Sequence, residues 1–398
     1  MVGIGGIGMS ALAQYFVHEG ALVAGSDREE SPTTAMLAEK GVAVVFGQKE
    51  ENVSEDTELL VYSDAVPADN PERVRATTLG IMQRSYFEAL GDVAKTKRTI
   101  AVAGTHGKTT TTAMLGRMLV DAGLDPTVVV GSIVTEWRSN FRAGSSDLFV
   151  VEACEYRNHF LAFRPEVLVI TNIELDHTDF FKSSDELESA FEEARRRAKT
   201  VIEASTYKHE RVPELLVPGE FNKENARAAK AAAKLIAPNV SDEVWDRSLA
   251  SYKGTWRRFE YKGRLPGGAV LYDDYAHHPT AIAKTVTAAK EKFPGKKIVL
   301  FFHPHLYSRT RDLFDAFAAA LAAADGVYIL PVYAAREPHD PSVSNKMLAN
   351  AVNAKGGHAQ PVVDFAEVEK LLSTLGADTV AFTMGAGDVY KAGESALK

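Results

Sequence analysis

Residues 99–110 read TIAVAGTHGKTT, and they carry the strongest structural signal in the chain. The run Thr99–Val102 predicts a strand, and Thr111–Ala122 predicts a helix that Gly123 closes. A strand, a glycine-containing loop ending in Lys-Thr and a helix form the context that a phosphate-binding loop requires. The general pattern has a further glycine at position 102, where this chain has valine, so the match is to a shortened variant of the loop.

The residue types in this loop suit a phosphate chain and a divalent cation. Glycine lets backbone N–H groups close on phosphate oxygens, and the N-terminus of the following helix adds positive potential. Lys108 can reach the β- and γ-phosphates, and the hydroxyl of Thr109 can bind Mg²⁺. The alternative is a glycine turn that only starts a helix. We predict phosphate binding, because the strand and the helix lie where such a loop needs them.

Two further segments offer metal ligands near this loop. The run 148–151 predicts a buried strand that ends at Glu152, and the run 166–171 predicts the next strand, followed by a segment that contains His177. Ligands gather at the carboxyl ends of parallel strands. A histidine in such a segment is commonly structural, and Mg²⁺ prefers oxygen ligands. We predict a metal site formed by Thr109, Glu152 and His177.

Short apolar runs alternate with helix-patterned segments, which predicts an α/β protein with mostly parallel sheets. The predicted strands are Ala21–Ala24, Glu58–Tyr62, Arg98–Val102, Leu148–Val151, Glu166–Thr171, Ala269–Tyr272, Lys297–Phe302, Gly326–Leu330 and Thr379–Phe382. Breaks at 91–98 and 249–254 predict three domains, at 1–96, 97–250 and 251–398. We expect a Rossmann-like N-terminal domain, a central parallel-sheet domain like that of P-loop ATPases, and a Rossmann-like C-terminal domain.

The composition excludes several classes of protein. The 398 residues are 45% hydrophobic and 25% charged, as in an ordinary globular protein, and the net charge of −8 argues against a broad nucleic-acid-binding surface. The single cysteine, Cys154, cannot form an intrachain disulfide and fits a reducing compartment. The sequence shows neither a membrane span nor a signal-peptide pattern. We expect a cytoplasmic protein that binds no nucleic acid and does not insert into a membrane.

The N-terminal residues 3–8 read GIGGIG, which fits the glycine pattern of a diphosphate-binding turn. A helix-like segment follows, and Asp27 lies 19 residues beyond Gly8, after a second strand. This spacing resembles a dinucleotide fingerprint. Only Met1 and Val2 precede the turn, so the first strand is expected to be very short. Nothing else in the sequence points to nicotinamide chemistry.

Two polar clusters follow predicted strands of the third domain. Residues 272–280 read YDDYAHHPT, and residues 303–312 read HPHLYSRTRD. Both are expected at the carboxyl edge of one sheet, where they would combine carboxylates, imidazoles and guanidinium groups. Such a set could suit an amino acid zwitterion. The alternatives are a structural hydrogen-bond network and a zinc site, whose usual spacings these clusters do not match.

The order of these motifs resembles the Mur ligase family over nearly the whole chain, and most closely its alanine-adding branch. The segments that carry the resemblance are Gly3–Ser10, Gly104–Thr110, Glu152–His159, Asn172–Asp179, Arg257–Glu260, Asp273–Thr280 and Tyr307–Thr310. The resemblance implies an ATP-dependent, amide-forming ligase with three domains. Such an enzyme would join L-alanine to the carboxylate of UDP-N-acetylmuramate through an acyl phosphate, in the peptidoglycan synthesis that serves cell-wall biogenesis, cell shape and cell division.

The resemblance also implies particular site residues. ATP binding is expected at Gly104, Thr105, His106, Gly107, Lys108, Thr109, Thr110, Asn222, Arg258 and Asp273. Substrate binding is expected at Gly5, Gly6, Gly8, Met9, Ser10, Asp27, Ser63, Tyr275, His277 and Arg309. The expected catalytic residues are Lys108, Glu152, His177 and His277, with ATP and Mg²⁺ as cofactors.

The chain departs from its relatives at several places. Leu306 stands where relatives often carry arginine, and Phe221 replaces a histidine of the adenine-side motif. The segment 200–218 looks shortened, and no lysine lies near Glu192, where many Mur ligases have a carbamylated one. Three alternatives remain: a murein-tripeptide ligase of the same family, a nicotinamide-dependent oxidoreductase, and a relative that binds ATP with weak or no catalysis.

Overall fold

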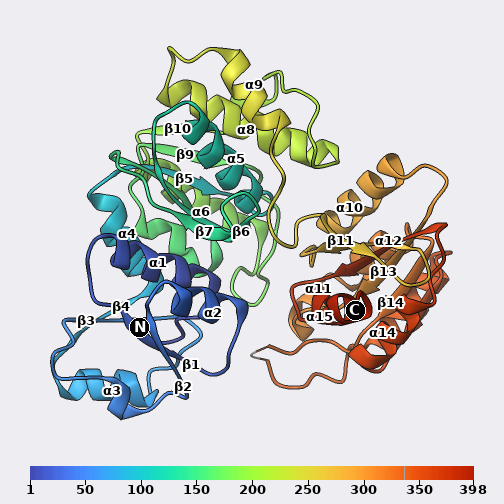
Figure 1. The fold of residues 1–398 in the computed structure, drawn as a ribbon. Coiled ribbons are helices and arrows are strands. Elements are labelled where there is room, and N and C mark those ends of the chain that lie inside the picture. The colour runs from blue at the N-terminus through green and yellow to red at the C-terminus, as the bar shows by residue number, and fades with distance from the viewer. Residues whose placement is uncertain (336) are drawn as a thin grey trace. The chain divides into compact units, whose positions relative to one another are not determined.

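The computed structural model describes residues 1–335 and 337–398, which fold into two compact units (Figure 1). Unit 1 comprises Met1–Ile173, Glu188–Pro213 and Asn225–Ala250. Unit 2 comprises Glu174–Leu187, Glu214–Glu224 and Ser251–Lys398. Two short segments from the middle of the sequence therefore belong with the C-terminal part. The largest piece of unit 2 begins next to the domain boundary predicted at 250, whereas the boundary predicted at 96 lies inside unit 1. The three predicted domain ranges stay a prediction.

The first part of unit 1 is a small α/β region with two pairs of parallel strands, and a single residue, Val2, connects the two pairs. Its elements are α1 (Ile7–His18), β1 (Ala24–Asp27), α2 (Pro32–Glu39), β2 (Ala43–Phe46), the 3-10 helix η1 (Glu50–Asn52), β3 (Leu59–Tyr62), α3 (Pro71–Thr78), β4 (Met82–Ser85) and α4 (Tyr86–Lys95). Strands β1 and β2 pair in parallel, as do β3 and β4. Val2 forms parallel bridges to Ser26 and to Tyr62, so it takes the place of a first strand between the two pairs.

The rest of unit 1 is built on a six-stranded sheet with the order β10-β9-β5-β8-β6-β7, in which only β7 is antiparallel to its neighbour. Its strands are β5 (Arg98–Ala103), β6 (Thr127–Val134), β7 (Ser139–Arg142), β8 (Leu148–Glu152), β9 (Val167–Ile170) and β10 (Thr200–Ile202). The helices of this region are α5 (Lys108–Asp121), η2 (Tyr156–Ala162), α6 (Ser184–Arg197), α7 (Ala204–Tyr207), α8 (Glu220–Ile236) and α9 (Asp242–Ala250). The order brings the carboxyl ends of β5, β8 and β9 to one edge.

Unit 2 contains a second six-stranded sheet with the order β11-β12-β16-β13-β14-β15, parallel except for β11. Its strands are β11 (Glu260–Arg264), β12 (Val270–Asp274), β13 (Lys297–Phe302), β14 (Gly326–Ile329), β15 (Ala359–Pro361) and β16 (Thr379–Met384). Its helices are α10 (Pro279–Lys292), α11 (Tyr307–Asp312), α12 (Phe314–Leu321), α13 (Asn345–Ala354), α14 (Phe365–Ser373) and α15 (Val389–Ala396). Phe301 and Phe302 lie in different apolar clusters, because successive strand residues face opposite sides of the sheet.

The apolar runs of the sequence mark most of the central strands correctly. Every residue of β9 is buried, and so is every residue of β16, which is why these strands read as continuous apolar runs. The strand predicted at Ala21–Ala24 is wrong, because the strand there is β1, which begins at Ala24. Leu22 is fully exposed. Helix α1 ends at His18, and the φ of +87° at Gly20 does not allow the helix to continue. The predicted α/β class with largely parallel sheets is confirmed.

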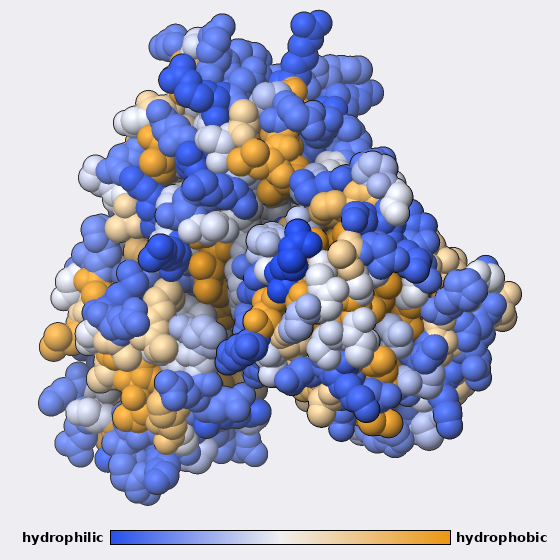
Figure 2. All heavy atoms as spheres, turned by 45° about the vertical axis from the view of Figure 1, so that its right-hand side comes forward, coloured by the Kyte–Doolittle hydropathy of each residue, from blue (hydrophilic) through white to orange (hydrophobic). Residues whose placement is uncertain are grey.

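The face of the molecule drawn in Figure 2 is mainly polar. Figure 2 shows hydrophilic side chains over most of the visible face, with apolar side chains in small separate groups. Within the part of the chain that the structure describes, no helix combines the length and the apolar character that crossing a bilayer requires.

Candidate functional site

The phosphate loop has a backbone that only glycine can follow at two positions. Gly104 has a φ of +127° and Gly107 a φ of +84°. A β-carbon on Gly104 would lie 2.1 Å from Oγ1 of Thr171, and one on Gly107 would lie 2.1 Å from Oδ1 of Asn225. Both positions therefore exclude any side chain, through backbone strain and through lack of space. Lys108 begins α5, so the loop ends on a helix N-terminus.

Hydrogen bonds connect the loop to the two residues that follow β9. The backbone N–H of Thr105 donates to the carbonyl of Asn172 at 3.0 Å, and that of His106 donates to Oδ1 of Asn172 at 2.9 Å. The hydroxyl of Thr171 and the amide of Asn172 both donate to the carbonyl of His106, at 2.6 and 2.9 Å. These bonds fix the loop before any ligand binds, which lowers the conformational cost of binding.

Lys108 is held by the protein itself. Its ammonium group donates to the carbonyls of Gly104 and Thr105 and lies 2.9 Å from the buried carboxylate of Glu155. Burial lowers the pKa of Lys108, but the negative charges around it, with Glu155 first among them, together outweigh burial, and the net pKa is raised. The side chain is therefore a permanent cation at the loop, as contact with phosphate requires.

Two oxygen ligands for a divalent cation lie beside the loop. The hydroxyl of Thr109 donates to Oε1 of Glu152 at 3.1 Å, and Oε2 of Glu152 accepts the N–H of Gly131 at 2.8 Å. A hydroxyl and a carboxylate from the ends of α5 and β8 form the hard-oxygen set that Mg²⁺ prefers, so the residues fit this ion. His177 lies in unit 2, with a φ of +54°. The site that combines it with Thr109 and Glu152 stays a prediction.

The N-terminal glycine turn is supported from the side of β1 and α2. Oδ2 of Asp27 accepts the N–H of Gly5 at 2.7 Å, and the hydroxyl of Thr33 donates to the carbonyl of Gly5. Asp27 therefore holds the turn itself in this structure, and its predicted substrate contact stays a prediction. The N-cap of α1 is Gly6, and no side chain of the described residues caps this helix. The first N–H groups of α1 are thus free of an intrahelical partner.

A buried polar network joins the same turn to the central sheet. The amide of Asn140, on β7, donates to the carbonyl of Ile7 and to Oγ of Ser10. Gln14 donates to Oδ1 of Asn140 at 3.0 Å, and Ser139 donates to Gln14 at 3.0 Å. All but Ile7 are at least nine-tenths buried. The network fixes the glycine turn within unit 1.

The remaining predicted residues of unit 1 lie on or beside these two turns. Met9 and Ser10 are buried in the first turns of α1, and Thr110 is buried in the first turn of α5. Ser63 follows β3, and its N–H donates to the carbonyl of Val2 at 3.0 Å. A β-carbon on Gly3 would lie 3.1 Å from Cβ of Ser63, so Ser63 lies next to the glycine turn.

In unit 2, the segment after β9 is held by residues of the C-terminal part. Nε of Arg309 lies 2.9 Å from Oδ1 of Asp176, and both side chains are buried. The hydroxyl of Thr280 donates to the carboxylate of Glu174. Burial raises the pKa of Asp176, but the basic groups around it, with Arg309 first among them, together outweigh burial, and the net pKa lies well below the usual value. His177 is therefore carried on a segment whose two acidic neighbours are anchored in unit 2.

His277 is a neutral imidazole at neutral pH. Its Nδ1 lies 2.9 Å from the carbonyl of Tyr275. Burial is the largest cause of its lowered pKa, and the charge of Arg309 lowers it further, so the pKa lies well below the usual value. A neutral imidazole can accept a proton, which is the property that a general base needs.

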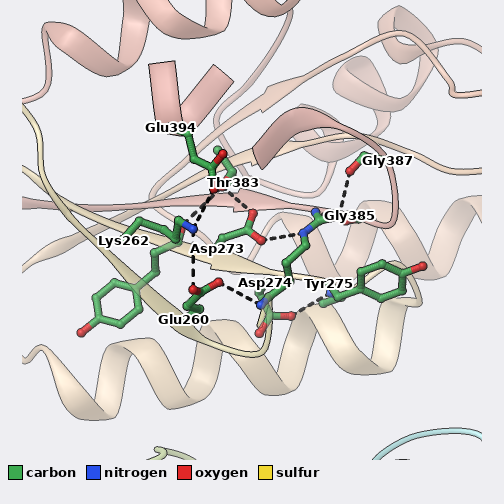
Figure 3. A network of polar contacts seen from close by, with 12 residues as sticks. Glu260, Lys262, Asp273, Asp274, Tyr275, Thr383, Gly385, Gly387 and Glu394 are labelled. Carbon is green, nitrogen blue, oxygen red and sulfur yellow. Dashed lines mark hydrogen bonds and ion pairs between the residues drawn. The ribbon is translucent and has the colours of Figure 1, made fainter. Parts of the chain in front are cut away.

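Figure 3 shows a polar network around Asp273, at the carboxyl end of β12. Nε of the buried Arg257 lies 2.7 Å from Oδ2 of Asp273. The same guanidinium donates to the carbonyls of Gly387 and Gly385 at 3.0 and 2.6 Å. The hydroxyl of Thr383 donates to Oδ1 of Asp273 at 2.6 Å. Asp273 is thus held by protein groups, and its predicted nucleotide contact stays a prediction.

The outer part of this network connects the edge strand to the last helix. Lys262, on β11, donates to Glu394, on α15, at 2.8 Å and lies 3.6 Å from Glu260 (Figure 3). Glu260 in turn accepts the N–H of Arg257 at 2.9 Å. The guanidinium carbon of Arg258 lies 5.0 Å from the ring centre of Tyr275, and that of Arg257 lies 5.2 Å from the same centre. Arg257 and Arg258 therefore share the ring of Tyr275, and Arg257 in addition pairs with Asp273.

Two of the unusual positions of the sequence have structural explanations. Phe221 packs against the core cluster of unit 2 and lies on Gly219, where a β-carbon would be 2.5 Å from its ring. Asn222 donates to the carbonyl of Pro218 at 2.7 Å. Leu306 is buried and has a φ of +69°. Neither the side chain of Phe221 nor that of Leu306 offers a hydrogen-bonding group.

Three contributors to these sites were not predicted from the sequence. Glu155 belongs to the segment Glu152–His159, and its acidic side chain three residues after Glu152 was the only sign of a role. Asn140 had no signal of its own. Arg257 belongs to the segment Arg257–Glu260 that carries the resemblance, but its contacts could not be predicted, because the partners of both residues lie far away in the sequence. Their burial and their contacts come from the folded chain alone.

The geometry of unit 1 defines an α/β protein with a phosphate loop and an adjacent pair of oxygen ligands for a divalent cation. Three family models match the chain in order. The model described as "Mur ligase family, catalytic domain" matches residues 1–98, "Mur ligase middle domain" matches 102–194, and "Mur ligase, glutamate ligase domain" matches 257–387.

Relatives and solved structures agree with these matches. The UDP-N-acetylmuramate–L-alanine ligase of Agathobacter rectalis is 38% identical, with 100% of this chain and 97% of the relative covered. The enzyme of that name from Desulfitobacterium hafniense is 39% identical, with 99% and 98% covered. The crystal structure of a UDP-N-acetylmuramate–alanine ligase from Thermotoga maritima superposes with a TM-score of 0.84 at 30% identity, covering 99% of this chain and 96% of that one. The chain belongs to the Mur ligase family.

Proposed function

We propose that the protein is an ATP-dependent ligase that joins L-alanine to the carboxylate of UDP-N-acetylmuramate, in the synthesis of the peptidoglycan precursor. The observation that carries the proposal is the phosphate loop with the Lys108 cation, paired with Glu155, and with the adjacent Thr109 hydroxyl bound to Glu152. The names of the full-length relatives support the choice of substrates. We further propose a cytoplasmic location, which the unpaired Cys154 supports.

The reaction takes place in two steps. A carboxylate oxygen of the sugar nucleotide attacks the γ-phosphorus of ATP, the bond to the β-phosphate oxygen breaks, and ADP leaves. The amine of L-alanine then attacks the carbonyl carbon of the acyl phosphate, the bond to the phosphate oxygen breaks, and the amine loses a proton as the amide forms. Each step develops negative charge on phosphate oxygens, so cations and N–H groups that already point at them lower the barrier.

In the first step the loop residues position the phosphates. We propose that Lys108 neutralises charge on the β- and γ-phosphates and that the loop amides from Gly104 to Thr110 hold their oxygens. A bound Mg²⁺ would supply further charge neutralisation. Thr109 and Glu152 would hold it, with His177 as the predicted third ligand. We propose that Asn222, Arg258 and Asp273 contact the nucleotide.

The substrates occupy two other places. We propose that the turn of residues 5–10 binds the diphosphate of the sugar nucleotide at the N-terminus of α1, with Asp27 and Ser63 beside it. We propose that Tyr275, His277 and Arg309 receive L-alanine in unit 2. His277 is neutral and can accept the proton that the amine loses.

The test is phosphate release from ATP in the presence of Mg²⁺ and UDP-N-acetylmuramate, with each amino acid added in turn. We expect release that requires L-alanine and is lost in Lys108→Ala. Lys355→Ala, which changes an exposed lysine at the end of α13, serves as the matched control and should keep full activity. Release with a murein tripeptide instead of L-alanine would identify the alternative ligase. No release with either, despite ATP binding, would refute the proposal.

A further inference from the structure

Tyr86 lies directly against the glycine turn. A β-carbon on Gly8 would be 2.5 Å from Cζ of Tyr86 and 2.7 Å from its hydroxyl oxygen. The third glycine of the N-terminal pattern is therefore needed because the phenol end of Tyr86 occupies the space beside it. The usual reason for this glycine is the close packing of the helix on a strand. Here the group beside it is a hydrogen-bond donor from α4.

The position of Tyr86 is fixed before any ligand binds. It is the first residue of α4, whose N-cap Ser85 forms a reciprocal capping box with Glu88. The neighbouring Phe87 stacks on His159 with ring centres 3.9 Å apart. A donor that is already oriented loses little conformational entropy when it makes a hydrogen bond.

The hydroxyl of Tyr86 is available to a ligand. The side chain is half-buried, and within residues 1–335 and 337–398 its hydroxyl makes no hydrogen bond. Burial raises the pKa of Tyr86, and the nearby Glu152 raises it further, so the phenol stays protonated at neutral pH. The group is therefore a donor that faces the turn without a partner in the protein.

The phenol of Tyr86 lies beside the glycine turn of the proposed site. Its hydroxyl lies beside Gly8, in the first turn of α1, and close enough to Glu152 to sense the charge of that carboxylate. The proposed sugar nucleotide has its diphosphate at the turn and its reacting carboxylate towards the ATP phosphates. A donor beside Gly8 lies next to the N-terminus of α1, where the diphosphate is proposed to bind.

We propose that Tyr86 is a substrate-binding residue whose hydroxyl donates a hydrogen bond to a phosphate oxygen of the sugar nucleotide, next to the amides of α1. The inference rests on the proposed function, since it assigns a new contact to the same substrate. The phosphate carries charge, and a hydrogen bond to a charged group contributes more than one between neutral groups. Loss of the hydroxyl should weaken binding of the diphosphate by about 10-fold or more.

The experiment compares Tyr86→Phe with Tyr15→Phe, which removes a hydroxyl from a buried tyrosine of α1 that makes no hydrogen bond among the described residues. Binding of UDP and of Mg²⁺-ATP is measured by calorimetry for each variant, together with the KM for UDP-N-acetylmuramate and the thermal midpoint. For Tyr86→Phe we expect UDP binding to weaken and the KM to rise by about 10-fold or more, with the affinity for Mg²⁺-ATP and the midpoint unchanged. Tyr15→Phe should resemble the parent protein in all four.

Three results would overturn the inference. Unchanged UDP binding by Tyr86→Phe, with or without a higher KM, would show that the hydroxyl does not contact the diphosphate. An equal loss of affinity for UDP and for Mg²⁺-ATP, or a lower thermal midpoint, would mean that the hydroxyl only supports the fold. Failure of the parent protein to bind UDP would overturn the proposed substrate as well, and this outcome is separate because it does not depend on the variant.

Discussion

Removal of the Lys108 charge should destabilise unit 1 in a pH-dependent way. The perturbation is Lys108→Met, which keeps most of the volume of the side chain and deletes its ammonium group. In the folded protein this group lies 2.9 Å from Glu155, whose side chain is 2% exposed. The variant therefore leaves a carboxylate buried without its cation.

The loss of unfolding free energy can be estimated for two states of the Glu155 carboxyl in the variant, ionised without a partner or protonated. Breaking one partner of a buried ion pair costs about 3–5 kcal/mol. The carboxyl can instead become protonated, which costs about 1.4 kcal/mol for each pH unit above a usual pKa of about 4.3, or about 3.7 kcal/mol at pH 7. The smaller cost applies, so we expect about 3–4 kcal/mol at pH 7 and about 1 kcal/mol at pH 5. In the variant, the pKa of Glu155 is higher in the folded state than in the unfolded state. The stability of the variant therefore falls as the pH rises.

The assay is urea unfolding followed by tryptophan fluorescence, at pH 5, 6 and 7. The matched variant is Lys108→Met combined with Glu155→Gln, which removes both charges. We expect it to recover most of the stability at pH 7, because no charge remains buried, while ligase activity stays absent because the cation at the phosphate loop is still missing. Glu155→Gln alone should cost less than Lys108→Met, since the lysine can turn towards solvent.

Two results would refute this reasoning. A loss below about 1 kcal/mol at pH 7 that does not change between pH 5 and 7 would show that Glu155 does not depend on the Lys108 charge. A double variant as unstable as Lys108→Met would show that the lysine stabilises the loop by contacts other than this ion pair.

Three further predictions test other parts of the structure. Gly104→Ala should abolish binding of Mg²⁺-ATP in calorimetry, because its φ of +127° and a contact of 2.1 Å exclude a methyl group; retained affinity would contradict the loop geometry. Asn140→Ala should lower the free energy of unfolding in urea by about 2–3 kcal/mol, because it leaves buried partners unsatisfied. It should also raise the KM for the sugar nucleotide more than the KM for ATP. No change in the free energy of unfolding and in the KM for the sugar nucleotide would contradict the role of the network. Asp176→Asn should lower the stability of unit 2 at pH 7. Since the folded pKa of Asp176 is depressed, its contribution is fully present above about pH 4 and decreases as the pH falls towards the folded pKa. The difference from the parent in acid unfolding should therefore become smaller as the pH falls below about 4, and a constant difference would contradict the ion pair with Arg309.

The phosphate loop and the class of fold could be predicted from the sequence because their signals are local. The run before Gly104 is apolar since β5 is buried on both faces, and the lysine and threonine after the glycines begin a helix at once. The order β10-β9-β5-β8-β6-β7 then brings Glu152 to Thr109, as the rule for parallel strands predicts.

The partners of these residues could not be predicted, because they depend on which distant segments meet. Glu155 binds Lys108, Asn140 binds the carbonyl of Ile7, and Arg257 binds carbonyls near the C-terminus. Nothing in the spacing of a single sequence encodes such pairs. The bond from the N–H of Gly5 to Asp27 could not be predicted for the same reason.

Local patterns in the amino acid sequence thus determined the strands, the two glycine turns and the chemical types gathered at the sheet edges, since backbone conformation and burial depend mainly on near neighbours. The tertiary structure alone decided which charges are paired and which donors remain available, as the contrast between Lys108 and the hydroxyl of Tyr86 shows. The physical reason is that a hydrogen bond or an ion pair requires two groups within a few ångströms, and chain folding sets that distance for residues far apart in the sequence.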